Sequence, residues 1–205
     1  MRRVRSQGDQ QGGTSADCGF FWHSRSIWQP EYTERAEIRC DVKLASFSGH
    51  ARKTPGQTDE EREWSLALQA TLEAVVLVDK YPKSMIDVFV LVLERDGSEL
   101  AAAINAASLG LADAGIEMSG LVAAVTVGCG PSGPLLDLSA DDEKMVSGGI
   151  TLASLPCSNA VVQFHTLSGV LPSGGTQGVP TLTQLALDAN ARLRDLAAMA
   201  LRASD

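Results

Sequence analysis

The pattern of apolar and polar positions predicts a strand, a turn and a buried helix in the middle of the chain. The stretch 86–93 is short, apolar and β-branched, which favours a buried strand. Asp96-Gly97 predicts a turn. From Ser98 onward small residues dominate, and Gly115 is typical of a helix end. Because this helix is apolar on nearly every side, we place it at the centre of the molecule, pressed on a sheet.

The flanking segments predict further strands and amphipathic helices. Segment 37–47 alternates apolar and polar residues, as a half-buried strand does. Thr58 and Glu61 form a capping box for a helix that we expect to stop near Tyr81-Pro82, because proline disfavours helical geometry in the residue before it. The other expected elements are strands at 121–127, 135–138, 150–155 and 160–165, an acidic loop at 141–143, and a helix at 182–200. This order predicts an α+β fold, a sandwich of one main sheet with helices.

The first 36 residues lack the regular spacing of apolar residues that predicts a helix or a strand. They are polar and rich in glycine and serine, with isolated aromatic residues, which is typical of a disordered tail. We therefore expect an atypical N-terminal segment at 1–36 and a single domain at 37–205. A chain of 205 residues is long enough for one such domain with its own core.

Composition narrows the classes of function. The net charge of −8 argues against a free-standing nucleic-acid binder held by bulk charge, although it leaves room for a local basic patch. The four cysteines show no C-x-x-C pair and no zinc spacing, so we interpret them as reduced thiols. No apolar run approaches the roughly 18 residues of a membrane span. We predict no metal, no cofactor and no membrane segment.

The central motif resembles a known family. The turn Asp96-Gly97-Ser98, the alanine-rich helix and the closing run 111–116, Leu-Ala-Asp-Ala-Gly-Ile, are similar to those of ribonuclease PH-like proteins. Among them, the chain looks most like ring subunits of the eukaryotic RNA exosome, closest to the type named for messenger-RNA transport. The resemblance covers roughly residues 38–201. It implies a ribonuclease PH-like fold, of the ribosomal-protein-S5-domain-2-like kind.

The N-terminal segment departs from the pattern of this family. Its members begin with a hairpin that carries a G-S-A…G-x-T-K-V signature, and residues 1–36 contain no such stretch. We therefore expect the first family strands to be missing or replaced, through a truncated or alternatively spliced N-terminus or through a lineage-specific extension. A sheet without these strands would have an unpaired edge.

Active members of the family use inorganic phosphate to attack the last phosphodiester of an RNA 3′ end. The resemblance places their phosphate loop at Ser98, Glu99 and Leu100, where Glu99 replaces a threonine and Leu100 an arginine. A carboxylate repels phosphate. The alternative interpretation of Glu99 is that it stabilises the first turn of a helix. A phosphate-contacting arginine of active relatives corresponds to Gln69.

The metal site that the resemblance implies is also incomplete. Its two acidic residues match Glu143 and Gly149, and one carboxylate with a glycine does not hold a divalent ion. The neighbouring acids are typical of a solvated edge. We therefore predict a degenerate site, with no catalytic residue and no metal ligand.

A basic cluster remains as a candidate contact with RNA. Lys43, His50, Arg52 and Lys53 lie on a predicted strand and the loop after it. In exosome ring subunits the comparable loop faces the central channel, and phosphate contacts there bind RNA without reading its sequence. The alternative is a basic loop that does no more than keep the chain soluble.

The resemblance implies a non-catalytic structural subunit of the exosome core ring, which threads RNA for 3′-to-5′ processing and degradation. Its partners would be the other ring subunits, the cap subunits, an associated nuclease and RNA in the channel, in the nucleus, nucleolus and cytoplasm. One alternative is an active phosphorolytic exoribonuclease, alone or through a composite site with a neighbour. Another is a product whose missing strands prevent assembly.

Overall fold

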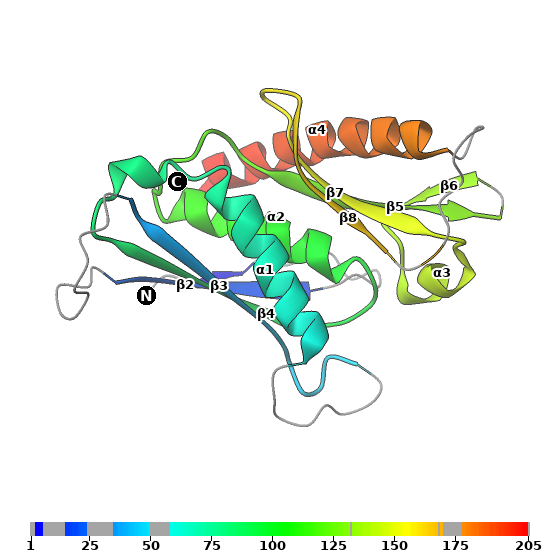
Figure 1. Cartoon of the computed structure of the whole chain (residues 1–205), viewed down its shortest axis with the longest axis horizontal. Coiled ribbons are helices and arrows are strands. Elements are labelled where there is room, and N and C mark those ends of the chain that lie inside the picture. Colours follow the sequence, from blue (N-terminus) through cyan, green and yellow to red (C-terminus); the bar gives the residue numbers. More distant parts are fainter. Residues whose placement is uncertain are drawn as a thin grey trace.

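The computed structural model describes residues 3–5, 15–23, 35–49, 58–131, 133–167, 169 and 178–204. These residues form four layers (Figure 1): a sheet, a pair of helices, a second sheet, and a long helix on its far side. The helices are α1 Asp59–Glu73, the one-turn η1 Val78–Lys80, α2 Glu99–Asp113, the short α3 Ala140–Met145, and α4 Val179–Ser204. No helix in the described ranges is both long and apolar enough to cross a membrane.

The strands are divided between two four-stranded sheets. The first sheet has the order β1-β2-β4-β3 and consists of β1 Arg3–Arg5, β2 Ser15–His23, β3 Glu37–Leu44 and β4 Met85–Glu94. The second has the order β6-β5-β7-β8 and consists of β5 Ala123–Gly130, β6 Gly133–Leu136, β7 Gly149–Leu155 and β8 Ala160–Thr166. The α+β class is therefore confirmed, but two sheets take the place of one main sheet. A helix that is apolar on both sides needs a sheet on each side of it.

The N-terminal segment contains strands, which corrects our expectation of an unpaired sheet edge. β2 runs antiparallel to β4, from Ser15 beside Glu94 to His23 beside Met85, and β1 pairs with β2 in turn. β3 pairs with the other edge of β4 in parallel. Backbone pairing of this kind does not depend on a signature sequence, because every residue except proline carries the same donor and acceptor. The boundary at residue 36 stays a prediction.

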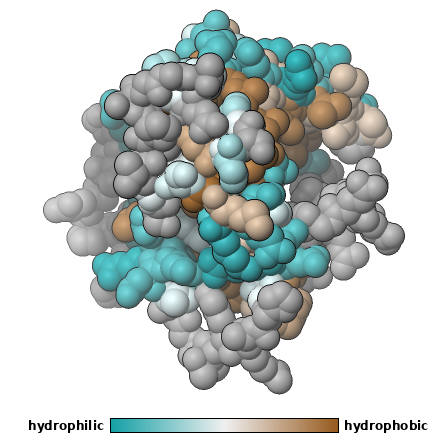
Figure 2. Space-filling model, turned by 90° about the vertical axis from the view of Figure 1, so that its right-hand side faces the viewer, coloured by the Kyte–Doolittle hydropathy of each residue, from teal (hydrophilic) through white to brown (hydrophobic). Residues whose placement is uncertain are grey.

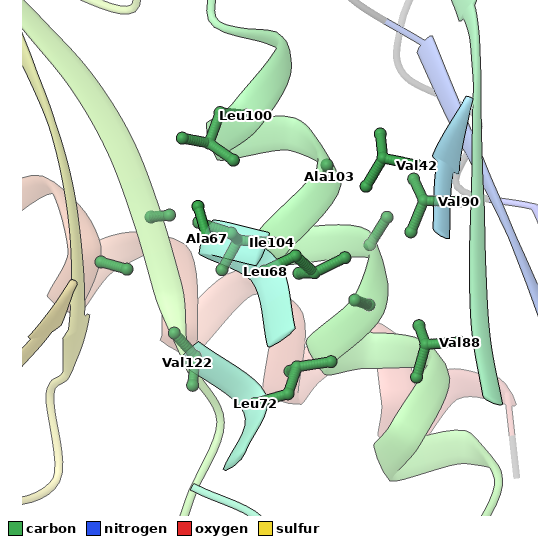
Figure 3. Packing of buried hydrophobic residues seen from close by; sticks show 14 of the residues in the cluster. Val42, Ala67, Leu68, Leu72, Val88, Val90, Leu100, Ala103, Ile104 and Val122 are labelled. Atoms are coloured by element: carbon green, nitrogen blue, oxygen red, sulfur yellow. The ribbon is translucent and has the colours of Figure 1, made fainter. Parts of the chain in front are cut away.

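The main core lies between the first sheet and the second, with α2 in its middle. Val88 and Val90 of β4 face Leu68 of α1 and Ile104 of α2 (Figure 3), and all four side chains are at most 1% exposed. Ala103 and Ala107 of α2 are fully buried as well, and their small side chains let the helix approach both layers closely. The predicted central position of this helix is confirmed. A second cluster lies under α4 and contains Val125, Val127, Ile150, Leu152, Leu182 and Ala186.

The start of α1 agrees with the predicted capping box, but its end lies earlier than predicted. Glu61 accepts the Thr58 N–H at 2.8 Å, and its other carboxylate oxygen accepts the Leu44 N–H at 2.9 Å, which ties α1 to the end of β3. The helix ends at Glu73 rather than near Tyr81. Beyond it, the backbone turns away to bond with segment 117–119, which includes Met118 in a bridge to Val76. Tertiary pairing has overridden the local helical pattern.

The predicted acidic loop is the short helix α3 instead. Ser139 caps it: the Ser139 Oγ accepts the Asp142 N–H at 3.3 Å, and the Asp142 carboxylate accepts the Ser139 N–H at 3.2 Å. This helix and β6 occupy one end of the molecule, where hydrophobic surface is uncovered between hydrophilic areas (Figure 2). The exposed apolar side chains of these two elements are Leu135, Leu136 and Met145.

Candidate functional site

The turn before α2 is fixed by its backbone conformation. Gly97 has φ +94°, and a Cβ at this position would lie 2.4 Å from the Leu138 carbonyl oxygen, so only glycine fits. Ser98 also has a left-handed conformation, with φ 57°, and its hydroxyl donates to the Leu138 carbonyl at 3.0 Å. The turn thus packs directly against the chain that leads into α3.

Glu143 of α3 reaches the start of α2. Its Oε1 accepts the Ser98 N–H at 3.2 Å, one of the amide groups that a helix N-terminus could offer to an anion. Burial raises the pKa of the Glu143 carboxyl, the negative charge of Glu99 raises it further, and the Ser98 N–H and Arg95 oppose both effects. The Ser98 N–H is therefore already bonded to a carboxylate of the chain itself.

Glu99 is buried, 6% exposed, in an ion pair. Its carboxylate accepts from the Arg95 Nε at 2.7 Å, and the Arg95 Nη1 lies 3.2 Å from the Glu60 carboxylate of α1. The Arg95 guanidinium also lies 5.6 Å from the centre of the Trp64 ring. Burial lowers the Arg95 pKa, but the carboxylates of Glu99 and Glu60 raise it by more, so the pKa lies above its ordinary value. The Arg95 guanidinium is therefore held by one buried carboxylate, that of Glu99, and one exposed carboxylate, that of Glu60.

Neither of the two positions matched to phosphate-binding arginines supplies a cation. Leu100 is 4% exposed and belongs to the main core (Figure 3). Gln69 donates to the Glu73 carboxylate at 2.8 Å along α1. The phosphate loop that we predicted to be degenerate therefore presents an internally paired acid and a buried leucine.

The positions matched to the metal ligands do not fit a divalent ion. Gly149 is buried at the start of β7, and a Cβ there would lie 3.0 Å from the Leu167 Cδ1 and 3.1 Å from the Val127 carbonyl oxygen, so a carboxylate has no room without a shift of its neighbours. Glu143 is engaged with Ser98. In the part of the chain that the structure describes, no group of three or more His, Cys, Asp or Glu residues could hold a metal ion.

Only one member of the predicted basic cluster lies in the described part of the chain. The Lys43 Nζ is 2.9 Å from the Asp41 carboxylate on the outer face of the first sheet, and this carboxylate raises the Lys43 pKa. His50, Arg52 and Lys53 lie outside the described residues. A contact between this cluster and RNA therefore stays a prediction.

We did not predict the network around Arg95 from the sequence. One signal was present, because Arg95 and Glu99 stand four residues apart with opposite charges, a spacing that pairs side chains in a helix. Here the two residues span a strand end and a turn, so that rule did not apply. Glu60 and Trp64 join them only because α1 packs beside the start of α2.

The fold is shared with solved structures. Rrp46 of rice matches 98% of this chain and 93% of its own, with a TM-score of 0.79 and 23% identity. A chain of the Archaeoglobus fulgidus exosome with RNA bound to the active site matches 95% of this chain and 86% of its own, with a TM-score of 0.71 and 15% identity. These likenesses confirm the ribonuclease PH-like fold.

Sequence comparisons give the family. Human exosome complex component MTR3 is 39% identical over 177 residues, 83% of this chain and 58% of the human protein, so the chain spans less than two thirds of that relative. An exosome component of Arabidopsis thaliana, RRP41-like, is 34% identical over 185 residues, 90% of this chain and 70% of the relative. The model of domain 1 of the RNase PH 3′ exoribonuclease family matches residues 10–117. The chain therefore belongs to the RNase PH 3′ exoribonuclease family.

Proposed function

We propose that this chain is a non-catalytic structural subunit of the exosome core ring, where it helps to thread RNA for 3′-to-5′ processing and degradation. Its family and the exosome relatives in human and Arabidopsis support a place in such a ring. The proposed partners are the other RNase PH-like ring subunits, the cap subunits, an associated nuclease and RNA in the central channel. The proposed locations are the nucleus, nucleolus and cytoplasm.

The observation that carries the non-catalytic role is the contact between Glu143 and Ser98. Phosphorolysis requires an inorganic phosphate held by cations and amide donors. Here a carboxylate already accepts the Ser98 N–H, and the neighbouring Glu99 adds a second negative charge. A phosphate brought to about 4 Å from one carboxylate meets a repulsion on the order of 1 to 4 kcal/mol, depending on solvent access. The site therefore disfavours the nucleophile that the reaction needs.

A second candidate function is phosphorolytic exoribonuclease activity, alone or through a composite site with a neighbouring subunit. The family itself favours it, because the matched family model is that of 3′ exoribonucleases. A neighbour would have to supply both the phosphate-binding cations and a metal ligand, since Leu100 and Gly149 supply neither. This requirement makes the alternative directly testable in an assembled ring.

The test measures release of nucleoside diphosphates from single-stranded RNA in the presence of phosphate and Mg²⁺. We expect the isolated chain to release none. We also expect a reconstituted ring to keep its rate, whatever that rate is, when Glu143→Ala or Glu143→Gln is introduced in this chain. Asp141→Ala is the matched control, because Asp141 is an exposed acid on the same short helix. A loss of activity with Glu143→Ala but not with the control would favour the enzyme.

Assembly is tested separately, so that a silent subunit can be told from an unassembled one. Native mass spectrometry of the tagged chain, isolated from its own cells, should find it with ring partners at a fixed stoichiometry. Fluorescence imaging of the same tagged chain should find it in the nucleus, nucleolus and cytoplasm. A chain recovered only as a monomer would contradict the structural role, whatever the activity assay shows.

A further inference from the structure

A cavity of about 500 Å³ opens between α2 and α4 at an uncovered edge of the second sheet. β6 pairs only with segment 127–130 of β5, so the first part of β5 has no neighbouring strand on that side within the described chain. Side chains from both helices line the gap, among them Ala101 and Asn105 of α2 and Ala189 of α4. The volume lies in the range of pockets that bind small molecules, so an extended side chain has room to enter.

The backbone of β5 at this edge is already satisfied by a side chain. The Asn105 Nδ2 donates to the Ala124 carbonyl at 2.8 Å, and the Ala124 N–H donates to the Asn105 Oδ1 at 2.8 Å. The amide of Asn105 thus takes the place of a neighbouring strand. Because these ladder groups are engaged, a partner cannot extend the sheet here by adding a strand, and an occupant must enter through a side chain.

The cavity is lined by more negative charge than positive charge. Three aspartates, Asp96, Asp137 and Asp188, are among the residues that line it, and Arg192 is the basic residue in the lining. Asp188 accepts from the Gln184 Nε2 at 3.2 Å. None of the four forms a salt bridge with another residue in the described ranges. Alanine and leucine side chains line the rest of the cavity.

This combination suits a cation with an aliphatic stem. The stem of arginine or lysine packs on apolar surface while its charged head reaches polar groups, and the planar guanidinium matches carboxylates best. RNA is disfavoured, because its phosphates would meet three carboxylates. At the margin, Leu196 is 61% exposed, and Met199 on the next turn of α4 is 60% exposed. These two side chains offer apolar surface to the residues that stand next to the arginine or lysine in the chain of the partner.

We propose that this cavity binds an arginine side chain presented by a protein partner, with the neighbouring residues of the partner packed on Leu196 and Met199. The proposal goes beyond the proposed ring function. The cavity borders the candidate site, because Gly97 and Ser98 line it as well. A protein partner would then bind at the acidic cavity, and RNA would contact another surface of the molecule.

The experiment is a ¹H–¹⁵N NMR titration of the full chain with N-acetyl-arginine methylamide. The matched probe is N-acetyl-citrulline methylamide, which has the same shape without the charge. We expect the arginine probe to shift the amide signals of Ala101, Ala124 and Ala189 in a saturable way, and the citrulline probe to bind about tenfold more weakly. Asp188→Asn should lower the affinity for the arginine probe by about threefold to tenfold. Asp195→Asn removes an acid elsewhere on α4 and should leave the affinity unchanged.

Three results would overturn the proposal. One is an equal response to both probes, which would mean that charge plays no part. Another is a set of shifts spread over the acidic surface and insensitive to Asp188→Asn. The third is a short single-stranded RNA that perturbs the same amide signals and displaces the arginine probe. The spectrum of each variant without probe verifies that it is folded, so that a lost response reports on the cavity.

Discussion

Glu143 accepts the Ser98 N–H in a half-buried position close to a second carboxylate, Glu99. The hydrogen bond favours the charged form of Glu143, whereas burial and the neighbouring acid favour the neutral form. The second pair of effects is larger, and the pKa is raised above the ordinary 4.5. A residue that stands where a metal ligand would be expected has thus become an internal acceptor, and its protonation is linked to folding.

This linkage predicts a dependence of stability on pH. The folded chain holds the Glu143 proton more tightly than the unfolded chain, so this residue lowers stability as pH rises from about 4.5 through its raised folded pKa. We expect Glu143→Gln, which keeps an acceptor oxygen, to be more stable than the wild type near neutral pH. The difference should shrink as pH falls toward 4.5. Urea unfolding of both proteins across this range measures it. A constant difference at every pH would contradict the assignment.

At the scale of elements, α2 is joined to the second sheet by side chains that bond to its backbone. Asn105 takes both polar groups of Ala124, and the Ser108 Oγ accepts the Val122 N–H at 3.0 Å. These bonds hold α2 against the start of β5, on the side where β6 does not pair with it. Burial of small residues places α2 close enough for such short side chains to reach the strand.

Asn105→Leu tests this joint. The substitution keeps the size of the side chain but leaves the Ala124 N–H and carbonyl without partners, so we expect a loss of about 2 to 3 kcal/mol in the free energy of unfolding. Ser108→Ala removes one bond of the same kind and should cost about 1 kcal/mol. Urea unfolding gives both values, and hydrogen exchange should show faster opening at Ala124 in the first variant alone. An equal loss of unfolding free energy in the two variants would mean that packing, and not the pair of hydrogen bonds made by the Asn105 amide, stabilises this joint.

At the scale of the whole molecule, the first sheet depends on the N-terminal segment. β2 pairs along nearly the whole of β4, whose alternate side chains form much of the main core. Without β2, the long apolar strand β4 would become a sheet edge, and an unpaired edge of this kind promotes aggregation. β1 and β2 are therefore part of the first sheet, although the boundary at residue 36 stays a prediction.

Two deletions separate the strands of this segment. Removal of residues 1–24 takes away β1 and β2, and we expect a lower melting temperature and concentration-dependent light scattering. Removal of residues 1–12 takes away β1 alone and leaves β4 covered, so its effect should be small. If the longer deletion behaved like the shorter one, the pairing of β2 with β4 would not support the fold.

The sequence by itself determined most of the helices and strands. Alternation, small residues and turn chemistry predicted β3, β4, α2 and the paired strands β7 and β8, because these signals are local and repeat along the chain. That Leu100 and Gly149 stand where active relatives have an arginine and a carboxylate is implied by the resemblance and stays a prediction. Where local patterns were weak, in β1, in β2 and in the acidic run of α3, the prediction differed from the structure.

Only the tertiary structure decided which side chains meet at the site that we predict to be degenerate. Glu143 and Ser98 are 45 residues apart in the chain, and Arg95 meets Glu60 across 35. No periodicity connects such pairs, since their contact depends on how the helices pack against two sheets. The same holds for β2 beside β4 and for the cavity between α2 and α4. Local signals specify which elements form, and long-range packing specifies which side chains those elements bring together.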